Sequence, residues 1–179
     1  MNLTILTEFQ LLEILTIFNL NDSDVDRVLN VLALMELHTS VTVSEFVNEI
    51  EFLEFPIIRL PISLEETVGV VGFMGNAGLL LDMKGTALRA VLKRICDTEF
   101  NYLFMKLNIS IYSDIEDGKK DIRSIIDILQ DIQDAQVTSQ QLCKIFGIPA
   151  YICVKSIIDQ GVETLRGFVT QLKLKKICF

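Results

Sequence analysis

The sequence predicts an all-α fold: a compact domain of about six to eight helices, because apolar residues recur every three or four positions along most of the chain. Half of the 179 residues are apolar, which is enough for one core of ordinary size. Several of the periodic segments follow a Ser or Thr with Glu or Gln three positions later, the pattern that caps the start of a helix. The composition therefore favours packed helices over disorder.

Residues 1–62 are expected to hold the first helices and then a break. Helical spacing marks three segments: 3–18, 22–38 and 42–54. Thr7 and Gln10 form a capping box at which the first helix can begin. Pro56 and Pro61 disfavour helix around them and mark a candidate internal boundary.

The next segment is unusual because glycines recur at every third position. After a capping box at Ser63 and Glu66, they occupy Gly69, Gly72, Gly75 and Gly78. Each glycine inside a helix costs about 1 kcal/mol relative to alanine. If helical, the four lie on one slowly drifting face that lets another backbone pack very close. They are therefore candidate interface residues, or they lie in an apolar loop or broken helix of the core, which is the simpler interpretation.

The second half of the chain is expected to be helical with one loop. Apolar spacing predicts a long helix over 86–107 and an amphipathic helix over 121–136. Between them, 108–120 is predicted to be a loop that turns at Asp117-Gly118. Residues 168–176 are predicted to form a short strand.

Residues 137–161 predict two short helices joined by a tight turn. Thr138 begins the first helix, with Gln141 completing a capping box. Gly147 supplies the left-handed residue that ends it, and Pro149 suits the first turn of the second helix. Ile148 is expected to fill the angle between the helices. The pattern indicates an αα-corner.

This corner resembles the helix-turn-helix of DNA-binding regulators over 137–161 only. The resemblance lies in Cys143, in Gly147 four positions later, and in the apolar Cys153 six positions beyond that. It implies base contacts from the start of the second helix, at Ala150, Tyr151, Val154 and Lys155. Among these, only Lys155 is a residue type typical of base readout. Counting phosphate contacts, the residues expected at DNA are Lys144, Tyr151, Lys155, Gln160, Arg166, Lys173, Lys175 and Lys176.

The charge distribution is consistent with two parts. Residues 1–70 hold 12 acids and 2 bases, whereas residues 140–179 hold 2 acids and 6 bases. We expect an acidic helical body over 1–136 and a C-terminal unit with a basic tail over 137–179, packed as one compact unit. The acidic body would repel DNA wherever it faced it.

The sequence argues against an enzyme and against a metal or cofactor. The one histidine, His38, has no nucleophile signature near it. The four cysteines lack the short spacings of a zinc site. The sequence Lys84-Gly85-Thr86 has the wrong order for a phosphate-binding loop. We therefore expect no catalytic residue, no cofactor and no small-molecule substrate.

Two functions remain, both of a non-enzymatic binding protein. The first is a transcription-type regulator that binds DNA through the corner. The alternative is a protein–protein adaptor or a structural or assembly subunit, for example of a phage virion. We expect a protein partner or self-association in either case. The longest uncharged run, 67–81, has 15 residues, fewer than the roughly 20 of a membrane span, and the N-terminus lacks a signal pattern. A cytoplasmic protein with no membrane contact is expected.

Overall fold

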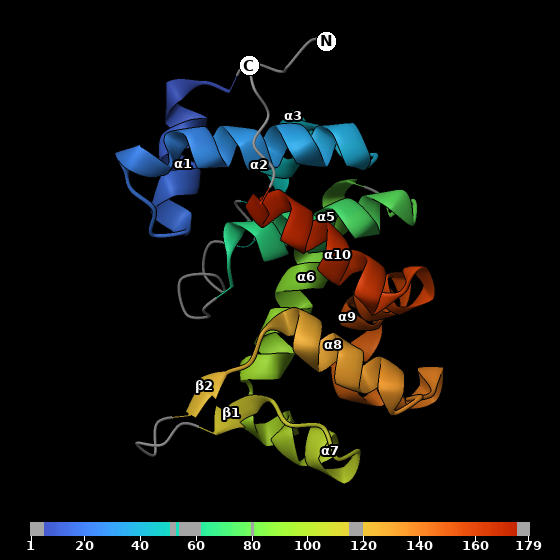
Figure 1. Cartoon of the computed structure of the whole chain (residues 1–179). Helices are drawn as coiled ribbons and strands as arrows, with labels where there is room; N and C mark the ends of the chain where they lie inside the picture. The colour runs from blue at the N-terminus through green and yellow to red at the C-terminus, as the bar shows by residue number, and fades with distance from the viewer. Residues whose placement is uncertain (1–5, 51–52, 54–61, 80, 115–119, 175–179) are drawn as a thin grey trace.

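A computed structural model describes residues 6–50, 53, 62–79, 81–114 and 120–174. These residues form nine α-helices, two short 3-10 turns and one two-stranded sheet, so the all-α prediction is confirmed. The molecule is elongated (Figure 1): α1, α2 and α3 lie at one end, α7 and the sheet at the other, and the remaining helices pack between them.

The first helices begin where the sequence places their caps. Helix α1 spans Glu8–Ile17, and the amide of Gln10 donates to the Thr7 hydroxyl at 3.3 Å, which confirms the capping box. A 3-10 turn at Asp22–Asp24 leads into α2, Val25–His38, and α3 follows at Val43–Ile50. The predicted segment 42–54 extends past Ile50 into residues that are mostly outside the described ranges, as are Pro56 and Pro61.

The glycine-rich segment is the central helix α5, Leu64–Asn76, so it is neither a loop nor a broken helix, but it packs inside the core as the simpler interpretation expected. The Ser63–Glu66 capping box is present, and every residue from Leu64 to Gly75 is buried. A continuous helix forms because its neighbours pack tightly against the glycine face, and this packing offsets their poor helix propensity.

The predicted helix over 86–107 is interrupted. Helix α6 spans Leu81–Cys96, a 3-10 turn covers Thr98–Phe100, and α7 spans Asn101–Lys106. The Asp97 carboxylate accepts a hydrogen bond from the Glu99 amide at 3.1 Å, and such local side-chain bonds compete with helix. The expected loop over 108–120 contains strand β1, Tyr112–Asp114, and ends at the first residue of strand β2, Lys120–Ile122. The two strands pair antiparallel with Ser113 opposite Asp121, so the start of the helix predicted over 121–136 is wrong, and that helix begins only at Ile125.

The C-terminal third forms α8 (Ile125–Asp134), α9 (Ser139–Gln160) and α10 (Val162–Leu174). Helix α9 is two helices joined at Gly147, whose φ of 73° and ψ of 170° are not helical, and the Thr138 capping box is present. The αα-corner is thus confirmed in outline. Ile148 does not fill the angle, since it is 71% exposed. The predicted strand over 168–176 is wrong, because α10 continues to Leu174.

By length and composition alone, α9 could cross a membrane, although 39% of its apolar window is buried inside the protein. The bend at Gly147 divides it into two shorter helices, and its inner face belongs to the protein core. One cluster of buried side chains extends from Ile14 to Leu172. The boundary expected at residue 136 stays a prediction.

Candidate protein-contact surface

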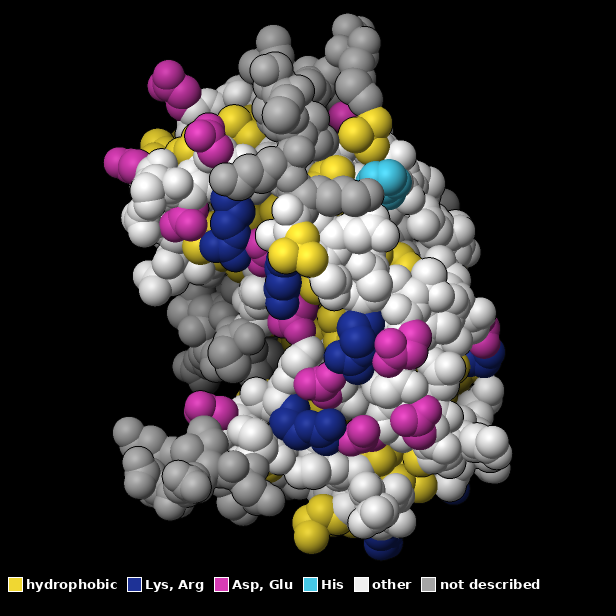
Figure 2. Space-filling view, viewed as in Figure 1, with side chains coloured by type: hydrophobic (Ala, Val, Ile, Leu, Met, Phe, Trp, Pro, Cys, Tyr) yellow, Lys and Arg dark blue, Asp and Glu magenta, His cyan; other side chains and the backbone are white. Residues whose placement is uncertain are grey.

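A groove opens on the surface where α2, α5, α9 and α10 meet, with a volume of about 600 Å³. Helix α10 lines it with Thr164, Gly167, Phe168 and Gln171. The neighbouring helices contribute His38, Phe73, Asn76 and Gln160. None of these residues is Asp, Glu, Lys or Arg, and we call the site the uncharged groove. In Figure 2, His38 (cyan) borders a broad area of uncharged polar side chains and backbone.

Two phenylalanine rings form the apolar floor of this groove. The Phe73 and Phe168 rings stack with their centroids 6.1 Å apart, and the His38 ring meets Phe168 edge-on at 6.2 Å. The Gln160 amide nitrogen donates to the carbonyl oxygens of Phe73 and Ser156, each at 2.8 Å. These contacts fix the floor and one rim before any partner binds.

The direction of α10 follows from its apolar spacing. Val162, Leu165, Val169 and Leu172 point into the core, so Thr164, Gly167 and Gln171 face outward. A side chain at Gly167 would meet no described atom within 4 Å. The groove therefore has open space above the middle of α10.

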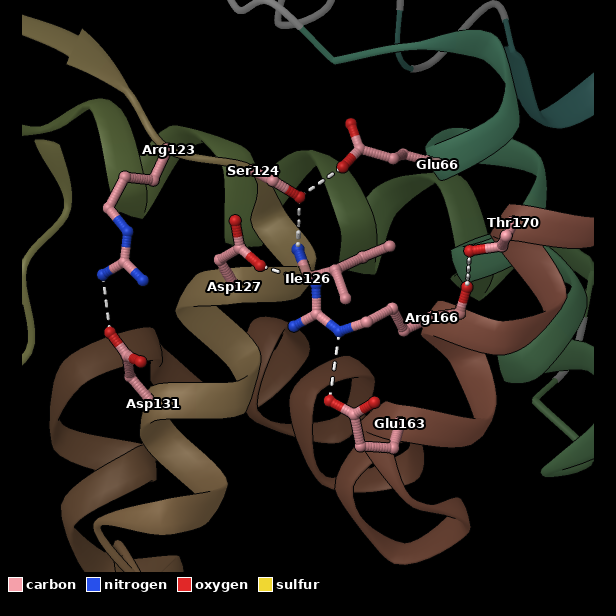
Figure 3. A network of polar contacts seen from close by, with 9 residues as sticks. All are labelled: Glu66, Arg123, Ser124, Ile126, Asp127, Asp131, Glu163, Arg166 and Thr170. Atoms are coloured by element: carbon pink, nitrogen blue, oxygen red, sulfur yellow. Dashed lines mark hydrogen bonds and ion pairs between the residues drawn. The ribbon is translucent and has the colours of Figure 1, made fainter. Parts of the chain in front are cut away.

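Charged side chains on α8, on α10 and just before α8 are paired within the chain (Figure 3). Arg166 donates to Asp127 at 2.7 Å and to Glu163 at 3.1 Å. The hydrogen bond to Asp127 raises the pKa of the Arg166 guanidinium above its usual value. Arg123 binds Asp131 at 2.5 Å, and the Ser124 hydroxyl donates to Glu66. These contacts connect α8 to α5 and α10.

A second ion pair joins α2 to the central helix. Arg27 donates to both Glu65 carboxylate oxygens at 2.8 and 2.9 Å, and the Glu65 side chain is only 2% exposed. Burial raises the pKa of Glu65, but the hydrogen bonds from Arg27 and the backbone outweigh it, so the pKa lies below its ordinary value. This pair is structural, because it fixes α2 against α5.

The residues expected at DNA are mostly occupied inside the chain. Lys155 pairs with Asp159, and Gln160 binds carbonyl oxygens. Tyr151 packs against the core, and Arg166 belongs to the network described above. Lys144 and Lys173 are exposed, whereas Lys175 and Lys176 lie outside the described residues. Ala150 and Val154, at the start of the second helix, are fully buried, so that helix cannot present these positions to a DNA groove.

Three of the four candidate interface glycines contact other parts of the same chain. A Cβ added at Gly69 would lie 2.5 Å from Val169 in α10, and one at Gly72 would lie 2.7 Å from Thr39. A Cβ at Gly75 would overlap Val41. Gly78 is exposed and has a φ of 76°. A role of these glycines in binding another chain stays a prediction.

Two observations concern the reactive groups of the described residues. Burial raises the pKa of the Cys153 thiol to about 12, which keeps it protonated and unreactive. No group of three His, Cys, Asp or Glu side chains suited to a metal ion occurs in the part of the chain that the structure describes.

Sequence reasoning missed the uncharged groove because four of its residues lie on α10, which was partly assigned to a strand. The sequence held one usable signal. Gly167 interrupts a pattern of apolar residues at helical spacing from Val162 to Leu172, and a glycine within a helix calls for a packing reason.

A family model described as "Phage-related minor tail protein" matches residues 10–147, more than three quarters of the chain. Neither the curated proteins nor the solved structures gave a significant match. The family match overturns the helix-turn-helix regulator suggested by residues 137–161. The corner is real, but it resembles that motif only in its turn, and the buried start of its second helix explains why the resemblance misled.

Proposed function

Because the chain belongs to the phage-related minor tail protein family, we propose that it is a structural or assembly subunit of a phage tail that acts by binding other protein chains. The family match carries this proposal, since it spans α1 to the Gly147 bend and therefore most of the folded core. The proposal replaces the regulator and adopts the alternative of an assembly subunit.

The surface of the protein supports a binding role. The uncharged groove offers an apolar floor with amide groups on its rim, which is the usual composition of a protein contact with a dry centre and a polar edge. Large apolar side chains are also exposed singly on other elements, including Phe9 on α1 and Met105 on α7, at 76% and 75%. In an assembled particle such side chains can be covered by neighbouring chains.

We propose further that the protein has no catalytic activity. The His38 ring contacts an aromatic ring rather than a nucleophile, and Cys153 is buried with its pKa raised. Asp127 and Glu163 are both paired with Arg166. The protein would be made in the cytoplasm and then incorporated into the tail.

The test asks whether the protein is incorporated into phage particles. An epitope-tagged copy is expressed in the host that encodes it, particles are purified on a density gradient, and the tag is located by immunogold electron microscopy. We expect the tag to sediment with particles and to label tails, and we expect deletion of the gene to yield particles with defective tails. Complete, infectious particles from the deletion strain, or a tag that stays with free protein, would refute the proposal.

A further inference from the structure

Helices α6 and α9 pack along each other and share a surface that contains bases but no acids. No Asp or Glu occurs over residues 83–96 or 135–158, although acids outnumber bases by 24 to 16 in the chain. Arg94 connects the two helices, because its guanidinium lies 3.7 Å from the place of a Cβ at Gly147, one turn after Lys144. We call the surface formed by four bases of these helices the basic seam: Arg89, Lys93, Arg94 and Lys144.

The bases of the basic seam have no acid partner in the part of the chain that the structure describes. Arg89, Lys93 and Lys144 form no ion pair there, and the Arg94 guanidinium lies over the Phe100 ring, 3.8 Å from its centre. Four bases elsewhere are each paired with an acid: Arg27, Arg123, Lys155 and Arg166. The basic seam therefore retains positive charge that the chain itself does not neutralise.

The first three helices carry the opposite charge. Residues 6–50, which we call the acidic end, hold 8 acids and 1 base, a net charge of −7. That base, Arg27, is held by Asp24 and Glu65. In Figure 2, acidic side chains (magenta) gather over this end of the molecule.

Each of the two charged surfaces also exposes a large apolar side chain. Ile148, at the bend of α9 beside the basic seam, is 71% exposed, and Phe9 on α1 is 76% exposed. Apolar side chains bordered by charges of opposite sign on the two surfaces are the usual composition of a specific protein contact.

The basic seam lies toward the end of the molecule opposite the acidic end (Figure 1). Phe100, which lies under Arg94, directly precedes α7. The Phe104 ring of α7 meets the Phe146 ring of α9 edge-on, with centroids 5.5 Å apart. Because α7 lies at the other end from α1, α2 and α3, one copy cannot bring its own two surfaces together, whereas a second copy can.

From this separation of charge we infer that the basic seam of one copy binds the acidic end of a second copy, so that copies associate end to end. The two contacting surfaces differ, so each copy keeps one of them free for a further copy, and such contacts produce rings or open chains. Duplex DNA is a poorer occupant of the basic seam, because the net charge of −8 repels a polyanion elsewhere on the surface.

This inference rests on the proposed function for its biological setting, because it names a second copy as one partner of an assembly subunit. Residues 10–147, which the family model matches, contain the four bases of the basic seam and most of the acidic end. The contact would therefore be built from the part of the chain that resembles the family.

The first test measures self-association of the full chain by sedimentation equilibrium from about 1 μM to 1 mM, a range that covers weak and moderate contacts. We expect association that grows with concentration at about 0.02 M salt and weakens at least tenfold at about 0.5 M, where the screening length falls to roughly 4 Å. A wild type that is monomeric at the highest concentration and low salt would overturn the inference, as would association that salt does not weaken.

A matched pair of variants locates the contact on the basic seam. Lys93→Glu should weaken association about tenfold, because a like charge then faces the acidic end. Lys173→Glu changes the net charge equally but lies on α10, outside the seam, and should not weaken association. Circular dichroism confirms that both variants are folded. An equal loss in both variants would mean that net charge, rather than this surface, controls association, and would refute the inference.

A charge exchange identifies the second surface. A Lys93→Glu, Lys144→Glu variant and an Asp22→Lys, Asp26→Lys variant should each remain monomeric alone, whereas an equimolar mixture should associate, because every reversed surface then meets one of opposite sign. A mixture that stays monomeric would refute the pairing of these two surfaces. Tight binding of mixed-sequence duplex DNA that Lys93→Glu abolishes, by a wild type that does not self-associate, would assign the basic seam to nucleic acid instead.

The outcome for the contact is distinguishable from the outcome for the proposed function. A wild type that does not self-associate but still enters phage tails would refute the end-to-end contact and leave the proposed function standing. A protein that associates through the basic seam but is absent from tails would refute the function and leave the contact standing.

Discussion

Replacing Gly69 by alanine tests whether the glycines of α5 are there for close packing. The new methyl would lie 2.5 Å from Cγ2 of Val169 and 3.1 Å from Cδ1 of Leu165. Both side chains are buried, with exposed fractions of 3% and 0%, so neither can rotate into solvent. Helix α10 must move away from α5, or one of these side chains must leave its preferred rotamer.

The expected magnitude combines two opposing effects. Alanine gains about 1 kcal/mol over glycine in helix propensity, whereas overpacking a filled core costs about 1–3 kcal/mol. The close contact to a confined side chain places Gly69→Ala toward the upper half of that range. We therefore expect a net loss of roughly 1–2 kcal/mol in the free energy of unfolding.

Urea denaturation followed by circular dichroism at 222 nm measures this loss, and a double variant tests its cause. Val169→Ala alone should cost roughly 2 kcal/mol, because it removes two buried methyl groups and leaves a small cavity. In the Gly69→Ala, Val169→Ala double variant the new methyl occupies that space. The combined loss should be smaller than the sum of the single losses by about 1 kcal/mol or more.

The matched control is Gly167→Ala on the open face of α10. It should raise the free energy of unfolding by about 1 kcal/mol. If Gly69→Ala is stabilised by the same amount, or if the double variant is strictly additive, close packing is not the reason for glycine in α5.

Three further predictions concern charge, capping and thiol reactivity. Arg27→Met should lower stability at pH 7 by about 2–3 kcal/mol, because Glu65 is left buried without its partner while the half-exposed arginine end limits the loss. Pairing lowers the folded-state pKa of Glu65, so the stabilisation from the ion pair is complete above about pH 4.5, the ordinary pKa, and disappears as pH falls through the lower folded value. The free energies of unfolding of the wild type and the variant, measured between pH 3 and 7, should therefore converge at the acidic end. A difference that stays constant with pH would contradict the role given to this ion pair. Thr138→Ala should cost about 1 kcal/mol through loss of the α9 cap, measured by urea denaturation, and no change would argue against the capping box. Iodoacetamide should modify the exposed Cys96 in the native protein and Cys153 only after unfolding, as detected by mass spectrometry. Equal rates of modification of the two thiols in the native protein would mean that the core around Cys153 opens readily.

Local sequence patterns determined where most helices begin. The capping boxes at Thr7, Ser63 and Thr138 occur where the sequence places them, because such a cap involves residues only three positions apart. The positive φ at Gly147 likewise follows from a local need, since glycine adopts that conformation without steric cost. The all-α class was predictable for the same reason.

What the local patterns could not determine was which surface each helix turns toward another part of the chain. Gly69 and Gly167 are both glycines inside helices. Only the tertiary structure shows that Val169 fills the space beside Gly69, whereas the space beside Gly167 is open. It also shows that Ala150 and Val154 are buried, which removes the positions needed for base contacts, and that Lys155 and Arg166 bind acids of the same chain. A turn of three or four residues is specified by its own side chains, whereas exposure depends on contacts between residues far apart in the sequence. For this reason the sequence by itself determined most of the helices and their caps, whereas the tertiary structure decided that the corner is part of the core and that α10 is packed closely at Val169 and open at Gly167.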